Sequence, residues 1–123
     1  PGYVYVKALR QDRQKMISGF EEAMSRVDVL ILPTTPLVAS RIGEDQETML
    51  SGQKVNTFLT FIRNCDPVSV VGYPAITVPA GYSDEGLPVG LQMVGRPWSE
   101  EQLLSLAYAF EQETKVRRPP VLT

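Results

Sequence analysis

The residues of this chain that could do chemistry include hydroxyls and carboxylates but no imidazole, because the sequence contains no histidine. Without an imidazole, neither a Ser-His-Asp nor a Cys-His arrangement can be built from these residues. A single cysteine and no histidine also make a zinc site unexpected. Glu44, Asp45 and Glu47 stand in a polar stretch that is typical of a solvated loop. We therefore predict no metal site, no cofactor and no catalytic residue.

Two candidate ligand-binding residues, Thr34 and Thr35, directly follow the apolar run 29–32 and Pro33. In open α/β sheets, ligand sites lie just outside the carboxyl ends of strands, so these two hydroxyls are candidates for lining a pocket. The alternative is structural. In that interpretation the prolines only end the strand, and the threonines bond to neighbouring backbone groups.

Two further candidates, Asp66 and Ser69, belong to the segment Asp-Pro-Val-Ser. A carboxylate in a binding site would favour a cationic or amine-bearing ligand, because it repels another carboxylate. A structural role competes with this one. Asp66 is a candidate N-cap for a short helix over residues 67–71, with Gly72 as its C-terminal stop.

The elements that must position these residues are predicted from the spacing of apolar side chains. An amphipathic helix is predicted over residues 3–27, which we expect to cover a sheet. Strands are predicted at 29–32, 75–78 and 89–94, with a turn-rich loop over 81–88, an irregular excursion over 38–53 and a helix over 56–63. The run 29–32 is apolar at every position, which is typical of a strand covered on both faces.

A last helix is predicted to begin after Ser99. Ser99 and Gln102 have the spacing of a capping box, and Trp98 and Leu103 have that of a hydrophobic staple. The side chains expected on the buried stripe of this helix are Leu103, Leu104, Leu106, Ala107 and Phe110.

Length and composition limit the classes of function. The chain of 123 residues has the size of one domain. Its net charge of −2 and pI near 5.1 argue against direct nucleic-acid binding, which requires a clustered basic face. No apolar run approaches the roughly 18 residues that span a bilayer, and no secretory signal is found. Cys65 has no cysteine partner within the chain, which favours a reducing compartment. We expect a cytoplasmic protein.

Several segments together carry a resemblance to a known family. They are D-V-L-I-L-P-T-T-P (28–36), R-I-G-E (41–44), G-Y-P-A-I-T-V-P-A-G (72–81), G-L-P-V-G-L-Q-M-V-G-R-P (86–97) and E-Q-L-L-S-L-A-Y-A-F-E-Q (101–112). In this order and spacing they resemble the C-terminal end of an amidase-signature enzyme. At residues 66–69 the chain departs from the Arg-Pro-Phe-Asn or Pro-Ala-Asn that family members often carry.

The resemblance implies a fold and a chemistry. The fold would be the C-terminal portion of an α/β/α unit, in which a mixed sheet is covered by helices, and residues 1–123 would be a segment of that single domain. The family's catalytic group is a serine nucleophile, a second serine at a cis peptide and a lysine base. The Gly/Ser-rich signature of that group is absent here, so we expect the catalytic residues upstream and the segment alone to be inactive.

Three functions are compatible with these observations. The first is an amidase that hydrolyses carboxamide C–N bonds through an acyl-serine, with this segment as sheet and cleft wall. The second is the A subunit of the glutamyl-tRNA(Gln) amidotransferase, which releases ammonia from glutamine. The third is a non-catalytic interaction fragment. Expected partners are a small-molecule amide and the N-terminal part of the same enzyme. A homo-oligomer is an option, and no membrane partner is expected.

Overall fold

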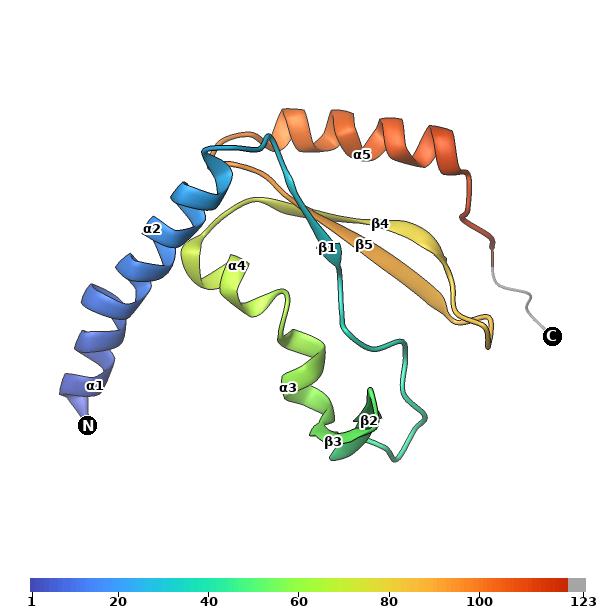
Figure 1. Cartoon of the computed structure of the whole chain (residues 1–123), viewed down its shortest axis with the longest axis horizontal. Helices are drawn as coiled ribbons and strands as arrows, with labels where there is room; N and C mark the ends of the chain where they lie inside the picture. Colours follow the sequence, from blue (N-terminus) through green and yellow to red (C-terminus); the bar gives the residue numbers. More distant parts are fainter. Residues whose placement is uncertain (120–123) are drawn as a thin grey trace.

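The computed structural model describes residues 1–119, and Figure 1 shows their arrangement. The helices are α1 (Gly2–Lys7), α2 (Arg13–Met24), α3 (Thr57–Ile62), α4 (Asp66–Val71) and α5 (Glu100–Thr114), with the π-helical segment η1 (Ala8–Asp12) joining α1 to α2. The strands are β1 (Leu30–Pro33), β2 (Glu47–Leu50), β3 (Gln53–Asn56), β4 (Ala75–Tyr82) and β5 (Pro88–Val94).

The main sheet has the strand order β1-β5-β4, and both strand pairs are antiparallel. The three strands predicted from the sequence are confirmed. The strand predicted at 75–78 is longer in the structure, because the pairing of β4 with β5 continues past an irregularity between Pro79 and Gly81. Pro79 has no backbone N–H to donate, and such residues are tolerated at sheet edges and bulges. The connecting turn is therefore shorter than the predicted loop and is closed by Ser83 N–H donating to Leu87 O at 2.8 Å.

Helix α5 packs across one face of this sheet, as Figure 1 shows. The buried cluster under it consists of Val78, Met93, Leu103 and Ala107, with Phe110 partly buried against it. Burial at Leu103, Ala107 and Phe110 was predicted. The predicted α/β fold is thus confirmed, with helix α5 over one face of an antiparallel sheet. The expectation that β1 is covered on both faces is wrong at Ile31, which stays 58% exposed because α5 contacts β4 and β5 instead.

The start of α5 differs from its predicted capping. The Trp98 side chain is 94% exposed, so it forms no hydrophobic staple with Leu103. The Ser99 hydroxyl donates to Arg96 O at 2.7 Å and does not cap an amide of α5. Trp98 has a φ of 67°, which is the left-handed backbone conformation, and its indole points away from the helix. The predicted burial of Leu104 and Leu106 is also wrong, since they are 60% and 37% exposed.

The segment 38–53, which we expected to be irregular, contains β2 and the start of β3. These strands form an antiparallel hairpin with Glu47 opposite Asn56 and Leu50 opposite Gln53. The turn residues Ser51 and Gly52 both have positive φ, as a two-residue hairpin turn requires. The Ser-Gly pair was the sequence signal for this turn. Across the hairpin Lys54 donates to Glu47, and that hydrogen bond, aided by the opposite charge, raises the pKa of Lys54.

The N-terminal helix predicted over 3–27 is confirmed as α1, η1 and α2, but it ends at Met24. It packs mainly on α4 and projects away from the sheet, so its predicted role as a cover for the sheet is wrong (Figure 1). Met24 is its one buried residue. Two arginines fix its position: Arg13 Nε donates to Val70 O at 2.7 Å, and Arg96 Nη2 donates to Met24 O at 2.9 Å.

Helix α4 ends at Gly72, as predicted, in the left-handed conformation with φ 80° and ψ 36°. We expect Gly72→Ala to lower the free energy of unfolding by about 1 kcal/mol, because a Cβ disfavours this conformation. The added Cβ would meet only Arg13 Nη2 at 3.7 Å, an ordinary contact, so the cost comes from the backbone. Urea denaturation measures the loss. Gly72→Asn is the matched control and should lose less, because Asn tolerates this conformation; equal losses would contradict the explanation.

Candidate functional site

The side chain of Thr34, the residue that follows β1, lies on the sheet face opposite α5. Thr34 N–H donates to Gly90 O at 2.9 Å, which extends the β1–β5 ladder by one residue. The Thr34 hydroxyl then donates to the Thr77 hydroxyl at 3.1 Å across β5. Thr77 is the cross-strand partner of Gln92, and neighbouring residues of a strand point to opposite faces. Since Met93 packs under α5, these polar side chains lie on the other face.

The turn between α3 and α4 lies against this polar face. Asn64 Nδ2 donates to Pro33 O at 2.7 Å, and Cys65 Sγ lies 3.4 Å from Thr34 O. Gln92 Nε2 donates to Asn64 O at 3.3 Å, and Gln92 Oε1 lies 3.5 Å from Cys65 Sγ. The thiol has one proton, so it donates to only one of its two neighbours at a time. These contacts join the end of β1 to the residue that precedes Asp66.

Thr35 combines both roles that the sequence left open. Its hydroxyl donates to Leu37 O at 2.6 Å, the local backbone bond expected of a structural residue. It also lines a cavity of about 230 Å³ between the residues that follow β1 and the start of β5. The cavity walls include Pro33, Leu37 and Gly90.

Asp66 and Ser69 lie one turn apart on the exposed side of α4. The prediction that Asp66 caps this helix is wrong. Cys65 occupies the N-cap position without a side-chain bond, and Asp66 is already the first helical residue. Proline is tolerated in the first turn of a helix, because its missing N–H needs no partner there. Helix α4 therefore starts at Asp66, one residue earlier than predicted, with Pro67 in its first turn. Among residues 1–119 neither side chain forms a hydrogen bond or ion pair, so both are available to a ligand.

The structure thus brings Thr34 against the turn that leads into Asp66 and Ser69. It adds Asn64, Cys65, Thr77 and Gln92, which the sequence reasoning missed. Gln92 was detectable, since it is the polar side chain inside the apolar run 89–94. Its partners were not, because they are about thirty residues away along the chain.

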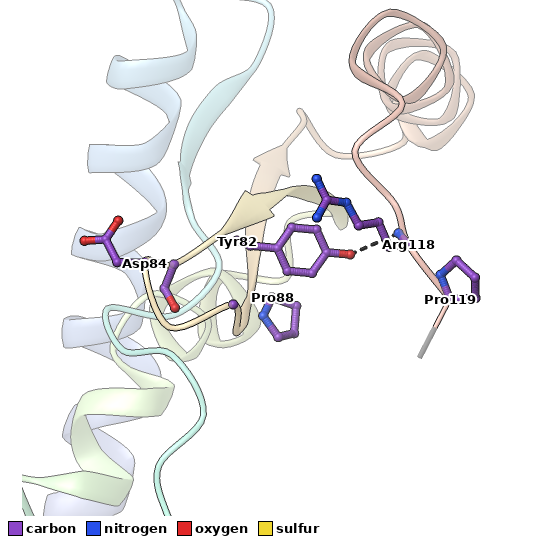
Figure 2. A pocket seen from close by; sticks show the side chains of 7 residues that line it. Tyr82, Asp84, Pro88, Arg118 and Pro119 are labelled. Carbon is purple, nitrogen blue, oxygen red and sulfur yellow. Dashed lines mark hydrogen bonds between the residues drawn. The ribbon is translucent and has the colours of Figure 1, made fainter. Parts of the chain in front are cut away.

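A separate hollow lies where the C-terminal segment crosses the hairpin of β4 and β5 (Figure 2). Arg118 N–H donates to the Tyr82 hydroxyl at 3.0 Å, and the Arg118 guanidinium carbon is 5.2 Å from the centre of the Tyr82 ring. This cation–π contact holds the segment on the hairpin. None of the four predicted ligand-binding residues lines this hollow.

Two properties of the described residues bear on function. Within residues 1–119 no three His, Cys, Asp or Glu side chains gather in a group that could hold a metal ion. Of the helices in this range, none is long and apolar enough to cross a bilayer.

Comparison with known proteins gives the context of this site. The family model described as Amidase matches residues 2–104 of the chain. The chain belongs to the amidase family. The matched range includes β1, α4, β5 and the turn between α3 and α4, so the candidate site lies within the part of the chain that matches the family.

Curated relatives of this amidase-family chain include the A subunit of the glutamyl-tRNA(Gln) amidotransferase from Methanosarcina mazei, 42% identical over 94% of the chain. The protein of the same name from Parvibaculum lavamentivorans is 43% identical over 94% of the chain. Among solved structures, 6-aminohexanoate cyclic dimer hydrolase superposes with a TM-score of 0.76 at 32% identity over 96% of the chain. The chain spans only 23% of the M. mazei protein and 26% of the hydrolase.

A second solved structure agrees with this alignment. The amidotransferase A subunit from Thermotoga maritima superposes with a TM-score of 0.75 at 28% identity, over 93% of the chain and 23% of its own length. The α/β architecture of the amidase-family segment is therefore shared with both hydrolase and amidotransferase relatives. The fold alone does not separate the two activities.

Proposed function

We propose that this chain is the C-terminal part of an amidase that hydrolyses carboxamide C–N bonds. In the proposed reaction an enzyme serine attacks the amide carbonyl, and ammonia or an amine leaves with a proton. Water then cleaves the acyl-serine to a carboxylate and regenerates the serine. The serine nucleophile, the cis-peptide serine and the lysine base belong to residues upstream of this segment. The 123-residue chain alone is expected to be inactive.

Residues 1–123 are proposed to be one piece of a larger single domain, whose N-terminal part is the principal partner. Exposed apolar side chains support this proposal. Tyr3 and Tyr5 on α1 are 73% and 70% exposed, and Phe58 and Leu59 on α3 are 65% and 61% exposed. Neither helix has a fully buried apolar side chain, and exposed apolar residues gathered in this way are typical of surfaces covered by further polypeptide. The alternative is a homo-oligomer, in which a second copy of the chain covers these side chains.

The observation that carries the amidase proposal is the family match over residues 2–104. The proposed cleft wall rests on the contacts between the end of β1 and the turn that leads into α4. We propose that Thr34, Thr35, Asp66 and Ser69 form one wall of the substrate cleft. Thr34 and the turn before Asp66 are in hydrogen-bond contact. Asp66 and Ser69 are exposed one turn apart, and Thr35, which follows Thr34 in the chain, lines a cavity. The substrate is proposed to be a small amide, and neither a nucleic acid nor a membrane is a proposed partner.

The alternative function is that of the glutamyl-tRNA(Gln) amidotransferase A subunit, which the identities of 42% and 43% favour. Against it, residues 66–69 depart from the Pro-Ala-Asn pattern of that protein. Copurification of a second polypeptide with the full-length protein, detected by native mass spectrometry, would favour the alternative.

A cytoplasmic location is proposed for either function. It is supported by Cys65, which is free and half-buried.

The experiment that tests the proposal measures product release by the full-length protein from glutamine, neutral aliphatic amides and amine-bearing amides. We expect turnover of at least one class, and turnover of none would contradict an amidase.

Asp66→Asn is expected to lower the preference for amine-bearing over neutral amides several-fold, because it removes the carboxylate that attracts the amine. Asp84→Asn, on the exposed β4–β5 turn, is the matched control and should leave the preference unchanged. An unchanged preference in Asp66→Asn would exclude Asp66 from substrate selection.

A further inference from the structure

Gln92 is a buried polar side chain in the middle of β5, only 4% exposed. A buried amide destabilises a fold unless its hydrogen-bonding groups are satisfied. An apolar side chain of similar length would fill the same space without that requirement. The presence of glutamine at this position therefore calls for a role for the amide group itself.

Both polar atoms of the Gln92 amide are used on the same turn. Nε2 donates to Asn64 O at 3.3 Å, and Oε1 lies 3.5 Å from Cys65 Sγ. The orientation of the amide follows from these partners, because only its nitrogen can donate to a carbonyl. Asn64 in turn donates through Nδ2 to Pro33 O at 2.7 Å. The turn is thus held on one side by β5 and on the other by the end of β1.

The turn leads directly into the exposed side of α4. Cys65 precedes Asp66, and Cys65 O accepts a hydrogen bond from Ser69 N–H at 3.0 Å. A shift of Cys65 would therefore carry Asp66 and Ser69 with it. Helix α4 has only six residues, so the contacts at its start help to fix its position, together with the bond from Arg13 at its end.

We propose that Gln92 is a positioning residue, whose amide sets the placement of Asp66 and Ser69 relative to Thr34 and Thr35. Gln92 lies behind the proposed wall and acts through Asn64 and Cys65. The effect on substrate binding rests on the proposed function. The effect on the turn does not, because it follows from the hydrogen bonds alone.

The test uses the full-length protein with Gln92→Met, which keeps the length of the side chain and removes both polar atoms. Val78→Ala is the matched control: Val78 is also buried, 6% exposed, but lies under α5 on the opposite face. In Gln92→Met we expect amide hydrogen exchange over residues 64–72 to accelerate about tenfold. Val78→Ala should lower the thermal stability without accelerating exchange in this segment. Unchanged exchange in Gln92→Met would overturn the proposal.

The second readout is kinetic and uses the amide from the panel that the parent enzyme hydrolyses fastest. We expect Gln92→Met to raise KM about tenfold with kcat within about twofold, because a displaced wall weakens binding of substrate and transition state alike. Faster exchange with an unchanged KM would overturn the link between the turn and substrate affinity. If the parent hydrolyses no amide, the proposed function fails, and the exchange data still decide whether Gln92 holds the turn.

Discussion

Leu103→Ala is expected to lower the free energy of unfolding by about 2 to 5 kcal/mol. Leu103 is 3% exposed and packs with Val78 and Met93 between α5 and the sheet. Its truncation removes apolar contacts and leaves a cavity. The cavity stays open because the hydrogen-bonded strands of the sheet limit how far the surrounding structure can move to fill it. Chemical denaturation with urea measures the loss as a shift of the midpoint at constant slope.

Leu104→Ala is the matched control on the next residue of the same helix. Leu104 is 60% exposed, so its truncation should change the free energy of unfolding by less than about 0.5 kcal/mol. The same chemical change is thus expected to have very different consequences at adjacent positions. Similar losses at both would contradict the placement of α5 on the sheet.

Gly90→Ala is expected to lower the free energy of unfolding by about 1 to 3 kcal/mol and to displace the candidate wall. A Cβ at this position would lie 2.7 Å from Thr34 Oγ1 and 2.9 Å from Thr77 Cγ2. Both threonines are β-branched and have few other rotamers to adopt. The added methyl group therefore forces apart the two hydroxyls that are hydrogen-bonded across β5.

Two further variants test this explanation. Gly19→Ala places the same methyl group on α2, where no atom lies within 4 Å, and should raise stability by about 0.5 to 1 kcal/mol through helix propensity. In a Thr34→Ala background, Gly90→Ala should cost less than in the parent, because the oxygen that it meets is gone. Additive losses in the double variant would show that the contact with Thr34 is not the cause.

The helices, the three strands of the main sheet and the family could be predicted from the sequence alone. The apolar runs at 29–32, 75–78 and 89–94 predict strands because a short apolar run bounded by turn residues is a local pattern of the sequence. Gly72 was recognised as a helix stop for the same reason, since a left-handed residue is a local requirement. The hairpin at Ser51 and Gly52 was also local, and the prediction of an irregular segment missed it.

How those elements contact one another is a property of the tertiary structure. It placed Leu104 in solvent and Leu103 in the core, a distinction that depends on how α5 is rotated on the sheet. It directed Trp98 outward, and it let Arg13 and Arg96 bind helix carbonyls far away in the chain. It also joined Gln92 to Asn64 and Pro33, residues that no local pattern connects. Side-chain partners of this kind depend on chain segments brought together by folding, and spacing along the sequence does not encode them.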